Sequence, residues 1–338
     1  MRILVTGGCG FIGSNFIHYL LKTYSDISII NVDKLTYAGN LENLSDLFHS
    51  PRYRFLRGDI AEPPFMEELI KKGVDAIVNF AAESHVDRSI EDPSTFMKTN
   101  IFGTFVLLEA MRKVLPEQKI HFIHISTDEV YGSLGETGAF TEDTPLSPNS
   151  PYSASKAAAD MMVRAYHQTY GLSAIITRCS NNYGPYQYPE KLIPLMITNA
   201  LEDKDLPIYG DGMHIRDWIY VEDHCRAIDK VLHHGKEGGI YNIGGRSERS
   251  NLSVAQTILD RLGKPHSLLR FVTDRPGHDR RYAIEFLKIE RELGWRPSVS
   301  FKEGIDLTVK WYQAHREWWR KIKTGEYLDY YNRMYQDR

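Results

Sequence analysis

Cysteine is scarce in this chain of 338 residues, and the three that occur, Cys9, Cys179 and Cys225, stand far apart. An odd and scattered set argues against a disulfide framework or a zinc site and fits a reducing compartment. The thirteen histidines show neither a His-Glu-x-x-His motif nor a paired Cys/His spacing. We therefore expect no metal site.

Long apolar runs and an excess of charge are also missing. No apolar run approaches the ~20 residues that a membrane span needs. A net charge of −3 gives no reason to expect a nucleic-acid surface. Met1 and Arg2 lead straight into an apolar strand without the hydrophobic region of a signal peptide. We expect a cytoplasmic protein that binds neither membrane nor nucleic acid.

A glycine-rich turn follows the apolar segment 2–6, which has the composition of a buried strand. Gly7, Gly10 and Gly13 can supply a tight turn, a close approach of backbone to phosphate, and close helix–strand packing. A helical pattern of apolar residues begins at Phe16, so the turn opens a helix whose N-terminus favours a pyrophosphate.

An acidic residue stands at the distance from this turn that a dinucleotide site needs. The second predicted strand, 27–32, ends in Asp33, twenty residues past Gly13. A carboxylate there can accept both hydroxyls of the adenosine ribose and would repel a 2′-phosphate, which favours NAD over NADP. The adjacent Lys34 weakens that preference. The alternative is a structural turn followed by a surface aspartate.

Further strand and helix patterns alternate along the chain and predict a doubly wound, parallel Rossmann sheet with a smaller α/β substrate-binding lobe. Strands are expected at 53–56, 76–80, 120–125, 173–179 and 239–245, and helices at 94–114 and 152–170. The expected NAD-binding domain comprises residues 1–180 and about 225–247. The expected lobe comprises about 181–224 and 248–338. The aromatic C-terminal tail from Trp311 suggests no chemistry.

Two carboxylates, a phenol and an ammonium follow the strand 120–125 along the chain and could share one site. Asp128 and Glu129 follow this strand, at the edge where open α/β sheets bind ligands. Tyr152 and Lys156 are spaced to share one face of a helix. An ammonium beside a phenol favours the phenolate and so lowers the pKa of the phenol, which is otherwise about 10. Taken alone, an Asp-Glu pair after a strand could equally be a helix cap or a solvated turn.

These groups suit a two-stage reaction on a sugar alcohol. A Tyr152 phenolate can take the hydroxyl proton while hydride leaves the carbon, with Thr127 hydrogen-bonded to the same oxygen. The ketone then acidifies the neighbouring C–H, so that Glu129 can remove that proton while Asp128 protonates a β-hydroxyl that leaves as water. A simple dehydrogenase needs no such acid pair.

A cluster of cations stands beside a proline–glycine turn in the second half of the chain. It includes Arg275 and His278, and Arg216 stands upstream in a loop-rich, aromatic region. Bidentate guanidinium groups suit a diphosphate. The alternative is a solvated basic loop. Likewise, His85 is as consistent with a packed structural histidine as with a functional one.

The glycine loop with Tyr152-x-x-x-Lys156 resembles the extended short-chain dehydrogenase/reductases over nearly the whole chain. The Thr127-Asp128-Glu129 triplet resembles that of the dTDP-glucose 4,6-dehydratases, a family whose pattern is also matched by segments 33–40, 181–191 and 275–279. The resemblance implies dehydration of dTDP-glucose to dTDP-4-keto-6-deoxyglucose, a tightly held NAD, and a homodimer built through a four-helix bundle.

The resemblance and the loop positions together give the expected site. The expected catalytic residues are Thr127, Asp128, Glu129, Tyr152 and Lys156. NAD is expected to contact Gly7, Gly10, Phe11, Ile12, Gly13, Asp33, Lys34, Thr36, Asp59, Ile60, Ala81, Ala82, Tyr152 and Lys156. The dTDP-sugar is expected to contact Ser84, Thr127, Glu129, Asn181, Glu190, Lys191, Leu192, Pro207, Tyr209, Arg216, Asn251, Arg275 and His278.

Two other functions share part of this pattern. An NAD-dependent nucleotide-sugar 4-epimerase would use everything except the acid pair. A non-catalytic NAD-sensing protein would need neither Tyr152 and Lys156 nor the two carboxylates.

Overall fold

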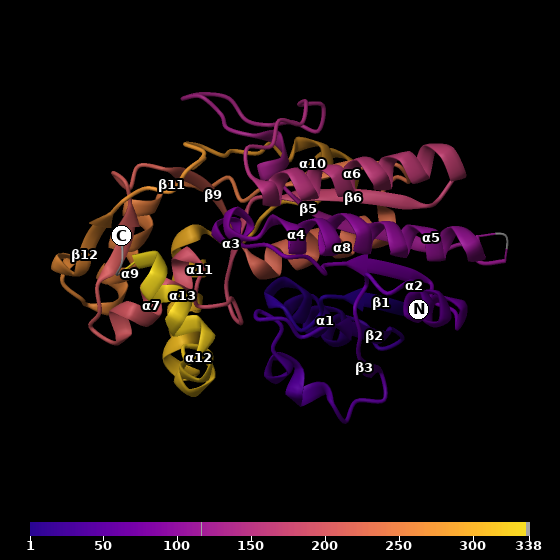
Figure 1. The fold of residues 1–338 in the computed structure, drawn as a ribbon, viewed down its shortest axis with the longest axis horizontal. Helices are drawn as coiled ribbons and strands as arrows, with labels where there is room; N and C mark the ends of the chain where they lie inside the picture. The colour runs from indigo at the N-terminus through magenta and orange to yellow at the C-terminus, as the bar shows by residue number, and fades with distance from the viewer. Residues whose placement is uncertain (116, 336–338) are drawn as a thin grey trace.

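A seven-stranded parallel sheet runs through most of the computed structural model, which describes residues 1–115 and 117–335 (Figure 1). Its strand order is β10-β6-β5-β4-β1-β2-β3. The doubly wound parallel sheet predicted from the sequence is therefore confirmed. The strands are β1 (Arg2–Thr6), β2 (Ser28–Asp33), β3 (Tyr53–Arg57), β4 (Ala76–Asn79), β5 (His121–Thr127), β6 (Ala174–Cys179) and β10 (Ile240–Ile243).

Helices cover both faces of this sheet because its strands are apolar on both sides. In β1, Ile3 and Val5 point into one core cluster, whereas Leu4 points into the other. The first cluster lies under α1 (Phe11–Thr23), α8 (Val221–His234) and α10 (Leu287–Leu293). The second lies under α2 (Pro63–Lys71), α5 (Thr104–Val114) and α6 (Pro151–Tyr170). Figure 1 shows α5 and α6 running together along one side.

The chain reverses its direction of winding between β1 and β4. From β1 it passes outward to β2 and β3, and then returns to place β4 on the opposite side of β1. Connections leaving the carboxyl ends of β1 and β4 therefore diverge and open a crevice, the usual ligand site of such sheets. Thr6 and Asn79 hold the two strands together here through a 2.6 Å hydrogen bond from Oγ1 to Oδ1.

A second, smaller body of structure carries its own core. It contains a three-stranded sheet of order β11-β9-β7 and a parallel pair of β12 with β8. Large buried rings of Tyr183, Tyr312 and Trp319 fill its core. Its elements are β7 (Asn181–Tyr183), α7 (Leu192–Leu201), β8 (Leu206–Tyr209), β9 (Ile215–Tyr220), β11 (Glu248–Ser250), α9 (Asn251–Leu262), η4 (His266–Leu268), β12 (Leu269–Val272), α11 (Phe301–Ala314), α12 (Arg316–Ile322) and α13 (Glu326–Tyr335).

The helix expected over 94–114 is interrupted. It consists of α4 (Pro93–Phe96), a π-helical stretch η2 (Met97–Gly103) and α5. Asn100 lies in this stretch, where its Oδ1 accepts from the Glu83 N–H at 2.9 Å and its Nδ2 donates to Ser155 Oγ at 2.8 Å. The remaining short elements are η1 (Leu41–Leu47), α3 (Val86–Glu91) and the 3-10 turn η3 (Asp128–Tyr131).

The C-terminal tail, in which the sequence suggests no chemistry, lies beside residues predicted to bind the sugar nucleotide. Tyr330 of α13 lies within hydrogen-bonding reach of His85, 3.4 Å from its Nδ1, and Tyr335 lines a cavity described below. Figure 1 shows α13 beside α11 in the smaller body of structure. No helix among residues 1–115 and 117–335 has the length and hydropathy that crossing a membrane requires.

Candidate active site

The glycine turn after β1 is the base of the site. Gly7 has φ +70°, and a Cβ there would lie 2.5 Å from the Ala81 nitrogen. A Cβ at Gly13 would lie 2.5 Å from the Gly7 oxygen. Both positions therefore require glycine. α1 begins directly afterwards, and its N-cap, Gly10, has no side chain that could block the helix N-terminus. This is the cradle that a pyrophosphate fits.

Asp33 is fixed at the end of β2 by two backbone donors. Its Oδ2 accepts from the Cys9 N–H at 2.9 Å, and its Oδ1 accepts from the Leu35 N–H at 2.8 Å. Lys34 turns away from this carboxylate, and its Nζ lies 2.8 Å from Asp59 Oδ2. The ammonium that weakens the predicted preference for NAD is therefore paired with a different acid.

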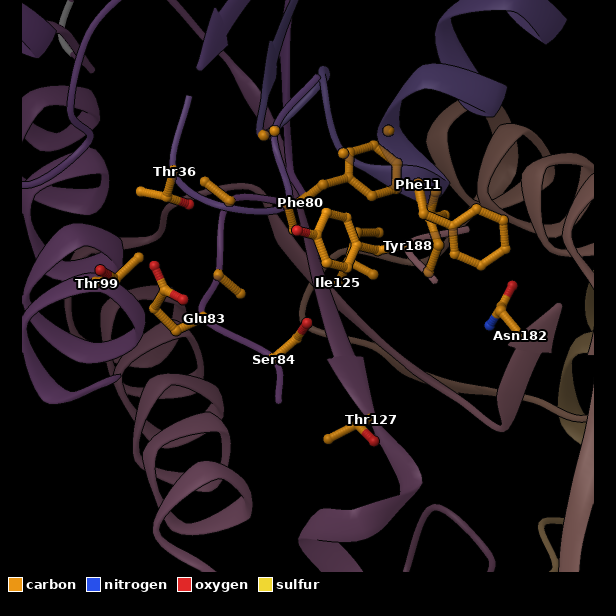
Figure 2. Close-up of a pocket in the computed structure, with 18 of the residues that line it drawn as sticks. Phe11, Thr36, Phe80, Glu83, Ser84, Thr99, Ile125, Thr127, Asn182 and Tyr188 are labelled. Carbon is orange, nitrogen blue, oxygen red and sulfur yellow. The ribbon is translucent and has the colours of Figure 1, made fainter. Parts of the chain in front are cut away.

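A cavity of about 310 Å³ extends from the glycine turn to the end of β5. Every residue predicted to bind NAD lines it, including Thr36, Ile60 and Ala82. Figure 2 shows Thr36, Thr99 and Glu83 on one side of this cavity and Phe11, Tyr188 and Asn182 on the other. Several further residues line the cavity without a role predicted from the sequence, among them Tyr37, Phe80, Glu83, Thr99, Asn182, Gln187 and Tyr188.

The start of α6 sets the positions of Tyr152 and Lys156. Ser150 caps this helix in a reciprocal capping box with Ser153, and Pro151 occupies its first turn. Tyr152 therefore lies in the first turn and Lys156 one turn later, both at the cavity wall. The Lys156 Nζ donates to the Ile125 carbonyl oxygen at 2.7 Å.

Burial dominates the titration of both groups. It raises the pKa of Tyr152 well above its usual value, with the Glu129 charge acting in the same direction and a hydrogen bond with Thr127 opposing it. This direction is opposite to the one that the Tyr/Lys spacing alone predicts. Burial also lowers the pKa of Lys156 to about 8, although Asp160 acts to raise it. In the protein alone, the tyrosine is therefore a neutral phenol.

The two carboxylates after β5 lie in different electrostatic surroundings. Thr127 caps η3 by accepting from the Glu129 N–H at 3.2 Å. Burial and the neighbouring Glu129 raise the pKa of Asp128 well above its usual value. Burial also raises the pKa of Glu129, but Arg275, Arg216 and Lys191 oppose the shift. The pKa of Asp128 is raised the more strongly, whereas three cations oppose the shift at Glu129. Asp128 is therefore the better candidate for the proton donor and Glu129 for the base.

A second cavity of about 150 Å³ adjoins the first. Glu129 lines both, so the acid pair stands where the two cavities meet. The residues predicted to bind the sugar nucleotide gather here, apart from Thr127, which lines the first cavity. They are Ser84, Glu129, Asn181, Glu190, Lys191, Leu192, Pro207, Tyr209, Arg216, Asn251, Arg275 and His278.

Arg88 joins three segments around this second cavity. Its Nε and Nη2 both donate to Glu190 Oε2 at 3.3 Å. The guanidinium carbon lies 3.9 Å from the centre of the Tyr37 ring and 4.5 Å from that of Tyr330. No role was predicted for Arg88 from the sequence. Its position in α3, nine residues beyond the end of β4, could have indicated it, whereas nothing in the sequence points to Tyr330.

The predicted diphosphate-binding cations are also held in place by neighbours. Arg275 donates from Nη1 to Asp87 Oδ1 at 3.1 Å, and its buried Nε has no protein partner. Arg216 lies with its guanidinium carbon 4.4 Å from the centre of the Tyr282 ring. Both cations therefore have positions fixed before an anion arrives.

Three potential metal ligands meet near His278. Its Nδ1 lies 2.7 Å from Asp274 Oδ1, and His214 Nε2 lies 3.2 Å from Asp274 Oδ2. The two imidazole rings are stacked, 3.7 Å apart and 13° from parallel. In-plane lone pairs of stacked rings do not converge on one ion, so we derive no metal site from this cluster.

Fold and site together define an extended short-chain dehydrogenase/reductase, with a dinucleotide crevice, a Tyr/Lys pair and a second lobe over the catalytic groups. Residues 4–308 match the family model described as GDP-mannose 4,6 dehydratase. The dTDP-glucose 4,6-dehydratase of Xanthomonas campestris pv. campestris (strain B100) is 53% identical to this chain over 340 residues, which cover 96% of each protein.

Solved structures of the same enzyme agree. That from Bacillus anthracis str. Ames, in complex with NAD, is 55% identical with a TM-score of 0.89, covering 96% of this chain and 100% of its own. That from Streptomyces venezuelae, with NAD and TYD (dTDP) bound, is 52% identical with a TM-score of 0.92 at the same coverage. The chain belongs to the dTDP-glucose 4,6-dehydratase family.

Proposed function

We propose that this protein is an NAD-dependent lyase that dehydrates dTDP-glucose to dTDP-4-keto-6-deoxyglucose. The observation that carries the proposal is the position of the acid pair in the cavity that also holds Tyr152. Asp128 is buried there, and Glu129 lines both cavities where they meet. An oxidoreductase that only moves hydride has no use for this pair. The relatives, which bear the name of this enzyme, support the same reaction.

The dinucleotide crevice fits NAD. Gly7, Gly10 and Gly13 leave room for the pyrophosphate, and the fixed Asp33 carboxylate suits the adenosine ribose. The chemistry that NAD supplies when bound is the reversible acceptance of a hydride, taken from C4 of the sugar and returned to C6. The chain itself must therefore move the protons and expel water.

The side chains divide that work between them. Tyr152 is neutral in the protein alone, but the positive charges of Lys156 and of a bound NAD⁺ would lower its pKa. As a phenolate hydrogen-bonded to Thr127, it takes the proton of the C4 hydroxyl as C4 becomes a ketone. Glu129 then removes the C5 proton, which the new ketone has acidified. Protonated Asp128 gives its proton to the C6 hydroxyl, which leaves as water and produces a C5–C6 double bond. After hydride reaches C6, a proton at C5 completes the product.

The diphosphate belongs against the cations of the second cavity. The side chain of Arg275 is 18% accessible, and its buried Nε has no protein partner, so an anion oxygen can occupy that position. Lys191 lies at the junction of the cavities and donates from Nζ to the Ser84 carbonyl oxygen at 2.9 Å. On this proposal, the glucose ring lies between the diphosphate and the acid pair.

Isotope transfer tests the dehydration against a 4-epimerase. Substrate deuterated at C4 is expected to give a product deuterated in its methyl group, lighter than the substrate by one water. The same reaction in D₂O is expected to label C5. Mass spectrometry of the product measures the loss of water, and NMR locates the deuterium. An isomeric sugar that keeps deuterium at C4 would instead establish the epimerase, and no conversion at all would establish a non-catalytic NAD protein.

We also propose a homodimer formed through η2, α5 and α6. The outer faces of η2 and α6 expose Phe102 and Met161, 43% and 49% accessible, beside an exposed Met97. Met161→Asp is expected to convert a dimer into a monomer in analytical ultracentrifugation. Met213→Asp, at a position exposed to the same degree (46%) but outside these helices, is expected to leave the dimer intact. A wild-type protein that sediments as one chain would contradict the proposal.

Two further proposals come from the sequence. We propose a division into an NAD-binding domain of residues 1–180 plus about 225–247 and a nucleotide-sugar lobe formed by the rest, which limited proteolysis can test. We also propose a cytoplasmic location, because Cys9, Cys179 and Cys225 are free and buried. Cell fractionation tests it, and recovery outside the cytoplasm would contradict it.

A further inference from the structure

A chain of buried polar side chains lies behind the catalytic wall, outside both cavities. Asp160 stands one helical turn beyond Lys156 on the same face of α6 and is 1% accessible. Its Oδ2 accepts from Arg178 Nε at 2.9 Å. Arg178, on β6, is 3% accessible. Removing both charges of a buried ion pair from water costs free energy that their attraction often does not recover. We therefore look for a role of this pair, which lies beside Lys156, other than stabilising the fold.

The other end of Arg178 reaches the turn that carries the acid pair. Its Nη1 donates to the Tyr131 hydroxyl oxygen at 2.9 Å, and its guanidinium carbon lies 4.8 Å from the centre of the Tyr131 ring. The same hydroxyl donates to Asn242 Oδ1 at 2.8 Å on β10. Tyr131 is the last residue of η3, which begins at Asp128. Arg178 therefore connects the helix of Lys156 with the turn of Asp128 and Glu129.

We propose that Asp160, Arg178 and Tyr131 form one positioning unit that holds the Lys156 ammonium and the acid turn (η3) in register. The proposal rests on the proposed function, because only a dehydratase uses both groups on the same sugar. Oxidation and elimination act on adjacent carbons, and a displacement of about 1 Å at either group can slow the reaction about a hundredfold. A common anchor fixes both positions at once.

Asp160 also sets the balance of charge around Lys156. Several titratable groups surround Lys156: Tyr152 and Asp160 on α6, His124 on β5, Arg178 and Cys179 on β6, and the acid turn. Burial lowers the pKa of His124 well below its usual value, so this ring is neutral. Asp160 therefore balances one of the two cations, and the cluster of Lys156, Asp160 and Arg178 keeps a single positive charge.

Asp160→Asn tests the charge. An arginine stays protonated in proteins, so loss of the carboxylate makes Lys156 the group that gives up its proton. The pKa of Lys156, about 8 in the protein, is expected to fall by about one unit or more. NMR of the ligand-free protein labelled with ¹⁵N-lysine reads this directly. The alkaline limb of the kcat profile is expected to move to lower pH by the same amount.

A matched control is available in the same chain. Asp223 is also 1% accessible and also pairs with an arginine, Arg226, but it belongs to α8 and not to the helix that carries Lys156. Asp223→Asn is expected to lower thermal stability without moving the pKa of Lys156 or the pH profile. If Asp160→Asn behaves like this control, Asp160 is only structural and the proposal fails. The NMR reading does not depend on which substrate the protein uses, so it separates this failure from failure of the proposed function.

Tyr131→Phe tests the other end without changing any charge. It removes the hydroxyl that Arg178 and Asn242 hold while keeping the ring. Water loss is expected to slow about tenfold relative to C4 oxidation, so reduced cofactor accumulates during turnover of dTDP-glucose. The pKa of Lys156 and the KM are expected to stay unchanged. Equal slowing of both steps, or no accumulation, would show that Tyr131 does not position the acid turn.

Discussion

Replacing Glu129 by glutamine is expected to stop the reaction after C4 oxidation. The amide keeps the size of the side chain but cannot accept the C5 proton, whereas Tyr152 and Lys156 are unchanged. Loss of a positioned base typically slows a step by about 10²–10⁴-fold. Reduced nicotinamide is therefore expected to accumulate on the protein after dTDP-glucose is added, and its near-ultraviolet absorbance measures it.

Two companion variants identify the step that is blocked. Tyr152→Phe lacks the group that takes the hydroxyl proton, so it is expected to give neither reduced cofactor nor product. Asp128→Asn is expected to accumulate reduced cofactor like the Glu129 variant, because the leaving hydroxyl loses its proton donor. Normal turnover by Glu129→Gln would place the elimination base elsewhere in the cavity.

Most of the candidate site could be predicted because parallel topology brings strand ends together. The glycine turn, Asp33 and the acid pair follow three different strands, yet all face the first cavity. Their positions after apolar strands were visible in the sequence. Family resemblance then supplied second-lobe residues such as Asn251 and Pro207, which line the second cavity and which no local pattern singles out.

The electrostatic environment could not be predicted from spacing. A tyrosine and a lysine at i and i+4 predict a lowered phenol pKa, but the depth of burial is a property of the packed structure. That burial, together with Glu129, raises the pKa of Tyr152 instead. The different surroundings of Asp128 and Glu129 likewise depend on Arg275 and Arg216, which arrive from the distant second lobe.

Contacts between distant segments were beyond sequence reasoning as well. Tyr330 meets His85 across 245 residues, and only the packing of α13 against the lobe brings them together. Arg88 is similar, because its two aromatic neighbours come from a loop near the glycine turn and from the last helix. A charged residue that belongs to no family motif is predicted to be solvent-exposed, because the sequence does not show which residues it contacts in the fold.

Arg88→Met is expected to destabilise the fold and to do so more strongly as pH rises. Glu190 is 1% accessible in its side chain, so losing its hydrogen-bonded cation leaves a buried carboxylate. Such a loss costs about 3–5 kcal/mol, and the lower end is expected because Lys191 also favours the ionised Glu190. Urea unfolding monitored by circular dichroism measures the difference from the unmodified protein.

The pH dependence follows from the protons bound by each state. Burial already raises the pKa of Glu190 in the folded protein, and removal of Arg88 raises it further. At a pH between the pKa of Glu190 in the unfolded chain and its higher pKa in the folded variant, the folded variant binds more protons than the unfolded chain. The unfolding free energy of the variant therefore falls as pH rises. The deficit is therefore expected to be small in mildly acidic buffer and full in mildly alkaline buffer.

Two further variants make this result specific to the buried pair. Arg88→Met combined with Glu190→Gln is expected to recover part of the lost stability and to lose the pH dependence, because no buried charge remains. Arg112→Met breaks the more exposed pair with Glu109, 2.9 Å apart, and is expected to cost much less stability because solvent screens an exposed pair. A deficit for Arg88→Met that is equally small, or independent of pH, would mean that Lys191 alone keeps Glu190 ionised and that Arg88 acts only through its stacking on Tyr37 and Tyr330.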